Sequence, residues 1–287
     1  MKAAFPSSKL RKYWKRSFGL AAKTRPKMVA GLFASMTLLL LLSLVSTPAR
    51  SAEQPSLLYA TAEAGSKLVA FSLEANRVRV IGDIGSPLSL ALAFCPPGGV
   101  PYTITNTFDP TAQLATLNRG TGAATLVGSP LGQALSIMGM TCSPDGTLYA
   151  VGQFDPTNPD FNSLYAVDRE TGLASRIGPT GVQDQESPYG GFLMALAFAP
   201  DGTLYGANVS TLFSIDPSTG QATKVVDFVG VTSVMGLAID KDGNFYVSEW
   251  VAAPSSIYGL NIATGVATPI LDTGLPLVHN IAFKAPG

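Results

Sequence analysis

Short apolar stretches alternate with turn residues over nearly all of residues 55–287. The clearest example is MALAFAPDGTLYGANVSTLFSIDPSTGQATKVVDF, residues 194–228. Apolar residues alternate with small or polar ones over four to seven positions. Pro-Asp-Gly and Thr-Gly turns separate these runs. This pattern has the period of two that is typical of strands, and Asp-Gly supplies the positive φ that tight hairpins require. The segment therefore predicts four antiparallel strands in succession.

The same pattern recurs along the chain. Further copies occupy residues 90–128, 138–178 and 235–271, and the glycines of the Thr-Gly turns are Gly122, Gly172, Gly220 and Gly265. These glycines are 50, 48 and 45 residues apart. Four short strands at such a period are typical of a β-propeller blade. We therefore predict an all-β fold consisting of a single β-propeller.

The two ends of this region complement each other. Residues 56–82 contain the last three strands of a blade, and residues 279–287 (HNIAFKAPG) contain a first strand that stops at a turn glycine. Pairing the C-terminal strand with the N-terminal blade gives five four-stranded blades, and the ring then has no free edge. The predicted propeller domain spans residues 52–287.

The first 51 residues have a different character. Residues 1–27 are polar and basic, and residues 28–46 form an uncharged apolar run before Ala49-Arg50-Ser51. This arrangement predicts a signal peptide over 1–51 that is cleaved before Ala52; an uncleaved signal anchor is the alternative. Either reading places the propeller outside the cytoplasm, periplasmic or secreted. The protein contacts a membrane only if the anchor is retained.

The formal net charge of zero combines two unequal parts. Ten of the 19 basic residues and no acidic residue lie within 1–51, so the remainder carries nine basic against 19 acidic side chains, a net charge of −10. An acidic body argues against nucleic acid as a partner. We expect a monomer whose partner is a protein, a glycan or a small molecule.

Variable and repeated connections separate the two faces of the ring. The first and third connections of each blade are uniform Pro-Asp-Gly-like and Thr-Gly turns, and we call the face that carries them the turn face. The second connections and the inter-blade links vary in length, and they define the loop face. The alignment assigns ten acidic residues to the loop face against Lys67 alone, and it assigns Arg176 and Lys224 to the turn face and outer strands. Variable loops on a rigid base are where binding groups usually lie.

Oxygen-bearing side chains follow the second strand of each blade and are predicted to ring the channel mouth: Glu63, Asn106, Gln153, Asn208 and Glu249. Such groups bind hard cations or sugar hydroxyls, and local turn capping is the alternative. Calcium is the candidate cofactor, with Glu63, Asp109, Asp155 and Glu249 as ligands. Asp109 and Asp155 lie in two FDPT loops that could flank a groove, and Trp250 could stack on a carbohydrate.

Two further groups come from aligning the innermost strands. His279 shares its position with Leu90, Met138, Met194 and Met235, a set that fits core packing better than soft-metal ligation. Cys95 and Cys142 end the first strands of neighbouring blades, which makes a disulfide a reasonable expectation for an exported protein.

The repeated phrases LYAVDRETGLASRIG and LAFAPDGTLYGA resemble those of secreted bacterial propellers of the NHL, YVTN and gluconolactonase-like kinds. The resemblance implies the propeller fold. In the gluconolactonase-like enzymes an Asn before an inner strand holds a divalent metal, and Asn280 matches it. The leading hypothesis is a non-catalytic binding module that recognises a ligand or protein through an acidic loop face. The alternatives are a metal-dependent lactonase-like hydrolase, using Asn280 with Glu63 or Glu249, and a lectin-like sugar binder.

Overall fold

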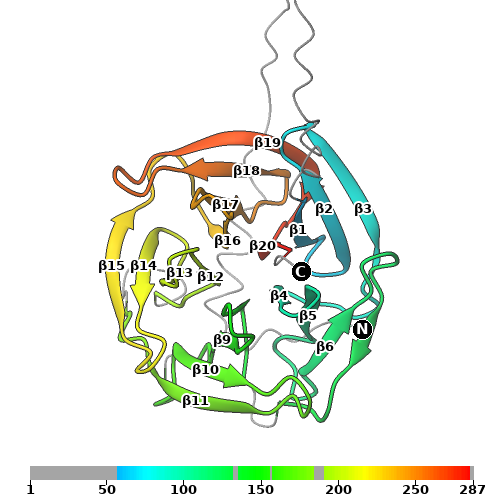
Figure 1. The fold of residues 1–287 in the computed structure, drawn as a ribbon, viewed down its shortest axis with the longest axis vertical. Coiled ribbons are helices and arrows are strands. Elements are labelled where there is room, and N and C mark those ends of the chain that lie inside the picture. The colour runs from blue at the N-terminus through cyan, green and yellow to red at the C-terminus, as the bar shows by residue number, and fades with distance from the viewer. Residues whose placement is uncertain (1–56, 132–134, 156, 184–190, 285–287) are drawn as a thin grey trace, which may run out of the picture.

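The computed structural model of this chain describes residues 57–131, 135–155, 157–183 and 191–284. The described residues form strands and turns without a helix, and the strands make five four-stranded antiparallel sheets around a central axis (Figure 1). The prediction of a five-bladed β-propeller is confirmed. The proposed signal segment 1–51 lies outside the described residues.

Each blade runs from an inner strand at the axis to an outer strand at the circumference. From inside outward, blade one contains β20 (Ile281–Phe283), β1 (Leu57–Ala62), β2 (Lys67–Ser72) and β3 (Arg77–Asp83), and blade two contains β4 (Ala93–Cys95), β5 (Val100–Thr105), β6 (Gln113–Leu117) and β7 (Ala124–Leu126). Blade three contains β8 (Gly139–Cys142), β9 (Leu148–Gly152), β10 (Ser163–Val167) and β11 (Ala174–Pro179). Blade four contains β12 (Ala195–Phe198), β13 (Leu204–Ala207), β14 (Thr211–Ile215) and β15 (Ala222–Asp227), and blade five contains β16 (Val234–Ile239), β17 (Phe245–Glu249), β18 (Pro254–Leu260) and β19 (Ala267–Pro276).

The two ends of the chain close the ring as the repeat pattern predicts. Strand β20 pairs antiparallel with β1, with Tyr59 opposite Ala282 and Ala60 opposite Ile281. Backbone hydrogen bonds from His279 N to Thr61 O (2.8 Å) and from Thr61 N to Asn280 O (3.2 Å) extend this pairing toward the loop face. Blade one is therefore assembled from both ends of the described chain, and its inner edge is covered.

The Thr-Gly turns owe their uniformity to contacts between blades. Gly122 and Gly220 both adopt a φ of +83°, and a Cβ at Gly220 would lie 2.6 Å from the carbonyl oxygen of Gly178 in the preceding blade. Only glycine combines a left-handed backbone with so close an approach. The outer strands run around the circumference in Figure 1. The end of an outer strand therefore meets the Thr-Gly turn of the following blade, as Gly178 meets Gly220.

The core lies between adjacent blades. Side chains on each sheet face pack against those of the next blade; one such cluster joins Ile104 and Leu114 of blade two to Met140 and Leu148 of blade three. The outer strand β3 instead exposes alternate valines, with Val80 47% exposed. An inner strand such as β16 is buried at every position, because both of its faces pack against neighbouring blades.

Cys95 and Cys142 form a disulfide between the ends of β4 and β8, with Cα atoms 5.1 Å apart. The pair is the one that the sequence predicted, and it ties the inner strand of blade two to that of blade three. Their one-residue offset in the repeat alignment does not keep the side chains apart, because neighbouring inner strands approach each other closely near the axis.

Replacing both cysteines with alanine is expected to lower the free energy of unfolding by about 4 kcal/mol, because the crosslink closes a segment with a sequence separation of 47 residues. Chemical denaturation of the double variant against the wild type, both under non-reducing conditions, measures this difference. The single variant Cys142→Ala is the control for thiol chemistry and should lose as much. A loss below about 1 kcal/mol would contradict a formed crosslink.

Candidate functional site

The axis of the propeller is filled by one amide among small residues. Asn280 is fully buried and donates from Nδ2 to the carbonyl oxygens of Met138 (2.7 Å) and Met194 (3.0 Å). Its own blade is blade one, whereas these carbonyls belong to blades three and four on the far side of the ring. The side chain therefore bridges the channel.

The four aligned positions on the other inner strands are small: Ala91, Gly139, Ala195 and Gly236. A Cβ at Gly139 would lie 2.7 Å from Ala195 Cα, and a Cβ at Gly236 would lie 2.5 Å from His279 O. Small residues let the inner strands approach one another and leave room for a single larger side chain. We call these five residues the Asn280 layer.

The Asn280 layer does not fit the metal site that the gluconolactonase-like resemblance implies. Asn280 Oδ1 is buried without a hydrogen-bond partner, which a metal ligand could be. However, the described residues contain no group of three or more His, Cys, Asp or Glu side chains placed to hold a metal ion. Calcium takes six to eight oxygen ligands, so a lone amide oxygen is insufficient.

His279 lies one residue toward the loop face from this layer. It is 1% exposed, its Nε2 has no hydrogen-bond partner, and its ring meets the Trp250 ring edge to face at 5.2 Å. Burial lowers the pKa of His279 to about 3, against a smaller opposing effect of the Leu90 carbonyl. The imidazole is therefore neutral at physiological pH.

The aligned residues Leu90, Met138, Met194 and Met235 form one buried apolar cluster with Phe192. All are at most 5% exposed. This packing agrees with the expectation that the methionines belong to the core.

His279→Met, which copies the residue of three other blades, is expected to flatten the acid dependence of stability. Because the folded-state pKa is below the unfolded value of 6.5, the unfolded state of the wild type takes up a proton first, and stability falls as pH drops from 6.5 toward 3. Between pH 7 and pH 4 the wild type should lose roughly 3 kcal/mol more than the variant. Urea denaturation at both pH values measures it.

Leu90→Met is the matched control, since it changes the same position of blade two without a titratable group. It should keep the wild-type pH dependence, to which the surface carboxylates contribute equally in all three proteins. Equal acid losses in wild type and His279→Met would contradict a neutral buried imidazole.

Aromatic side chains cover the apolar cluster on the loop face. Phe108, Phe154, Phe161 and Trp250 are partly exposed and pack against it. The Phe108 and Phe154 rings lie 5.8 Å apart, and Phe154 and Phe161 contact Phe192 at 5.1 and 5.9 Å. We call these four residues the aromatic cap. The sequence indicated the two FDPT loops and Trp250 separately, but not that Phe161 joins them in one cluster.

The two FDPT loops come together through these rings and have the same local structure. Asp109 Oδ1 accepts hydrogen bonds from Thr111 Oγ1 (2.7 Å) and Thr111 N (2.8 Å), and Asp155 Oδ1 accepts from Thr157 in the same way (2.8 and 2.9 Å). These bonds lower the pKa of both carboxyls. Both side chains are exposed, so two ionised carboxylates lie in the loops that carry the aromatic cap.

The five predicted oxygen ligands do not occupy equivalent positions in their blades. Glu63, Asn106 and Gln153 follow the ends of β1, β5 and β9 with positive φ values of 51°, 53° and 65°, whereas Asn208 follows β13 without one and Glu249 is still within β17. A shift of one residue along a strand reverses the direction of a side chain.

Local hydrogen bonds occupy most of these polar groups. Asn106 Oδ1 accepts from Ser86 (3.0 Å), Gln153 Oε1 from Asp155 N (3.3 Å) and Glu249 Oε1 from Ser256 N (3.2 Å). Asn208 Oδ1 accepts from the backbone N–H groups of Ser210 and Thr211 (2.9 and 2.8 Å). These contacts are those of strand-end capping, the alternative considered from the sequence.

The charge of the loop face is less one-sided than the alignment indicated. Asp83 pairs with Lys67 (2.6 Å), Asp160 with Arg176 (3.0 Å) and Asp227 with Lys224 (2.6 Å). Arg176 and Lys224, which the alignment grouped with the turn face and outer strands, thus reach acids assigned to the loop face. Arg176 and Lys224 lie in the outer strands β11 and β15, and their long side chains extend toward these acids. Asp184 and Glu186 lie outside the described residues.

Comparisons with known proteins agree with the fold. The chain resembles a solved structure of a nidogen/laminin complex, at 14% identity over 80% of this chain and 98% of that chain, with a TM-score of 0.52. It also resembles a protein of unknown function from Bacteroides caccae, at 12% identity over 81% of this chain and 100% of that chain, with a TM-score of 0.50. A gluconolactonase from Xanthomonas campestris has 18% identity over 79% of each chain and a TM-score of 0.47.

No protein-family model matches the chain, and no curated protein matches it. At these identities the structural similarities show the fold alone. The described part of the chain is a five-bladed β-propeller.

Proposed function

We propose that this protein is an exported binding module that recognises a protein partner through the loop face, with the aromatic cap at the centre of the contact. The observation that carries the proposal is the contact of Phe108 with Phe154, which places two partly exposed rings from neighbouring blades beside the carboxylates of Asp109 and Asp155. Aromatic residues are enriched in the buried centres of protein interfaces, and charged residues at their rims.

The chemistry of the cap defines the partner. Half-buried rings on a rigid apolar cluster lose little conformational entropy on binding, because their rotamers are already restricted by packing. No described residue forms an ion pair with Asp109, Asp155 or Asp272. A partner surface with an apolar centre and basic residues around it would complement this arrangement. Calcium is not part of the proposal, since no group of metal ligands is assembled among the described residues.

Export remains a proposal based on the N-terminal segment. Across the described ranges no helix has the length and apolar character needed to cross a bilayer. The predicted signal lies within residues 1–51. N-terminal sequencing of protein recovered from the periplasm or medium of producing cells tests the predicted start at Ala52, and recovery only from the cytoplasm would overturn it.

The test of partner binding uses site-specific photo-crosslinking in cells that produce the full chain. A photoreactive amino acid is placed at Asp109 or Asp155, and at Glu170 or Ser218, which are equally exposed on Thr-Gly turns of the opposite face. A discrete crosslinked species is expected from the first pair only. Introducing Phe108→Ala or Phe154→Ala should remove it without lowering the amount of folded protein.

Ser210→Ala, an exposed loop-face change outside the aromatic cap, is the control and should preserve the crosslink. Crosslinks of equal yield from both faces, or their persistence in both phenylalanine variants, would overturn the proposal.

A further inference from the structure

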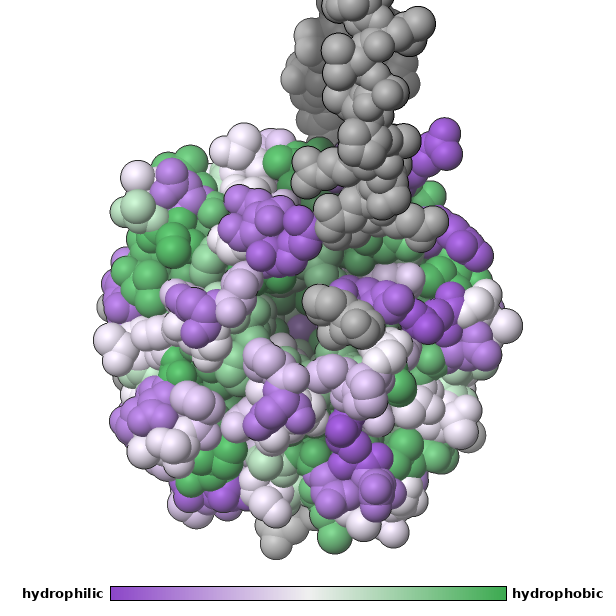
Figure 2. Space-filling model, in the orientation of Figure 1, coloured by the Kyte–Doolittle hydropathy of each residue, from purple (hydrophilic) through white to green (hydrophobic). Residues whose placement is uncertain are grey.

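A cavity of about 600 Å³ lies on the axis at the turn face, the side that the sequence assigned to scaffold. It forms the hollow at the centre of the face shown in Figure 2. The inner strands of all five blades supply apolar wall residues, among them Ala93, Met140, Leu196, Leu237 and Ile281. Asn280 and two glycines, Gly139 and Gly236, immediately precede wall residues in the chain, so the Asn280 layer lies at the inner end of the cavity.

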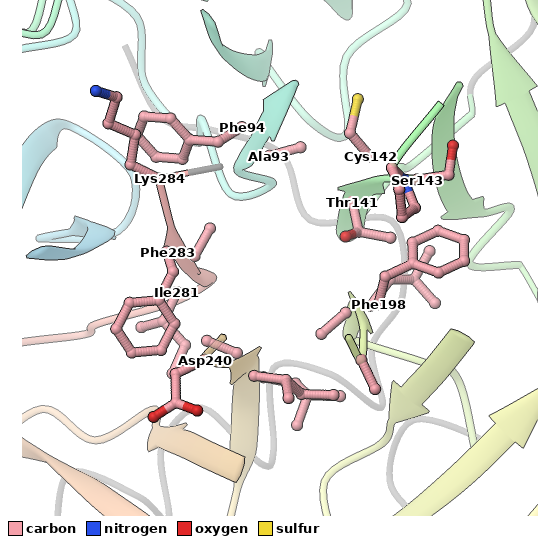
Figure 3. Close-up of a pocket in the computed structure, with 18 of the residues that line it drawn as sticks. Ala93, Phe94, Thr141, Cys142, Ser143, Phe198, Asp240, Ile281, Phe283 and Lys284 are labelled. Carbon is pink, nitrogen blue, oxygen red and sulfur yellow. The ribbon is translucent and has the colours of Figure 1, made fainter. Parts of the chain in front are cut away.

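The rim of the cavity is aromatic and its walls are apolar. Phe94, Phe198 and Phe283 stand around the mouth, on strands of blades two, four and one (Figure 3). Cavities of several hundred Å³ lined largely by apolar side chains are the usual sites for small organic molecules.

Most polar groups at the mouth are already engaged. The Asp240 carboxylate accepts hydrogen bonds from Asn244 Nδ2 (2.8 Å), Tyr246 OH (3.0 Å) and two backbone N–H groups. Ser143 Oγ donates to Asp145, and Lys241 Nζ pairs with Asp242 (3.1 Å). The Asp240 carboxylate and the Lys241 ammonium therefore already have hydrogen-bond or ion-pair partners within the protein.

Two polar groups at the cavity have unused hydrogen-bonding capacity. Within the described part of the chain, neither Thr141 Oγ1 nor Lys284 Nζ has a hydrogen-bond or ion-pair partner. Figure 3 shows the Thr141 hydroxyl beside the open centre, and the Lys284 amine turned outward into solvent. Lys284 is exposed, and its flexible four-carbon stem can rotate back over the mouth.

We propose that this cavity binds a small organic anion with an apolar body, such as a medium-chain carboxylate. The body would lie against the five wall residues, and the anionic group would receive a hydrogen bond from Thr141 or an ion pair from Lys284. The charges favour an anion, because the Asp240 carboxylate is saturated by four donors, whereas the Lys284 ammonium has no ion-pair partner among the described residues. This site is on the opposite face from the proposed partner surface and does not depend on it.

Titration calorimetry with decanoate on the purified full-length protein tests the proposal. We expect saturable binding of one decanoate per chain, with decanol weaker and decylammonium weaker still. Lys284→Met should weaken decanoate roughly three- to fivefold, the range of a single exposed ion pair, and leave decanol unchanged. Lys241→Met, at the same rim but with its charge already paired, should change decanoate binding by less than Lys284→Met.

Thr141→Phe fills the cavity from a partly exposed position and should abolish binding of both decanoate and decanol. Thr141→Val keeps the shape of the side chain and should retain decanol binding, which separates loss of cavity space from loss of the fold. Thermal melts check that both variants are folded. No saturable heat with decanoate, equal affinity for decylammonium, or full binding by Thr141→Phe would each overturn the proposal. The crosslinking result on the loop face does not change with any of these outcomes.

Discussion

Truncation after Leu277 is expected to abolish cooperative folding of the propeller. It removes β20 together with Val278, His279 and Asn280, and both Val278 and Ile281 are at most 1% exposed. Burying each aliphatic side chain contributes about 1.5–3 kcal/mol, and the loss also exposes the edge of β1. The sum is comparable with the whole stability of a domain, about 5–15 kcal/mol. Circular dichroism melts and proteolysis of the truncated chain measure the effect.

A circular permutant distinguishes ring closure from chain length. Phe283 pairs with Leu58 as Phe198 pairs with Leu204, so a copy of the Ala199–Thr203 turn can join Phe283 to Leu58. New ends at the exposed Ala252–Ala253 bond lie in a second connection of blade five. This permutant should melt cooperatively near the wild-type temperature. A truncated chain that unfolds cooperatively at the wild-type temperature would contradict closure by β20.

Asn280→Asp is expected to destabilise the protein by roughly 3–5 kcal/mol at pH 7, although it changes a single non-hydrogen atom. The new carboxylate cannot donate to the carbonyls of Met138 and Met194, and it would be a buried, unpaired charge. Burial raises the pKa of such a group, so the unfolded state ionises first as pH rises. The deficit should therefore shrink as pH falls from 7 toward 4. Urea denaturation at the two pH values gives the measurement.

Asn208→Asp is the matched control, since Asn208 uses its oxygen to accept from the N–H groups of Ser210 and Thr211. A carboxylate keeps those bonds, and the change should cost less than about 1 kcal/mol. Equal effects of the two substitutions would show that Asn280 is not held by donation from Nδ2.

The blade pattern was predictable because its determinants are local. Each Pro-Asp-Gly or Thr-Gly turn and each alternating run appears within a few residues of sequence, and the repeat averages out the ambiguity of any single strand. The incomplete blades at the two ends revealed the closure of the ring by the C-terminal strand, now observed as pairing of β20 with β1.

The candidate site was less predictable. Glu63 and Glu249 appear equivalent in the alignment, but they differ by one position relative to the ends of β1 and β17, and such a shift reverses a side chain. Arg176 and Lys224 lie in outer strands, as the alignment assigned them, but a linear alignment does not show that their side chains reach Asp160 and Asp227. The aromatic cap depends on contacts between blades, which no spacing within one repeat encodes.

By itself, the sequence determined the number of blades, the turn chemistry, the closing strand and the cysteine pair, because these follow from periodicity and local backbone preference. The tertiary structure alone decided what occupies the axis. Asn280 reaches Met138 across 142 residues of sequence and Met194 across 86, and the cavity walls combine residues from all five inner strands. Five distant segments converge there, so the space between them is set by how closely the blades pack.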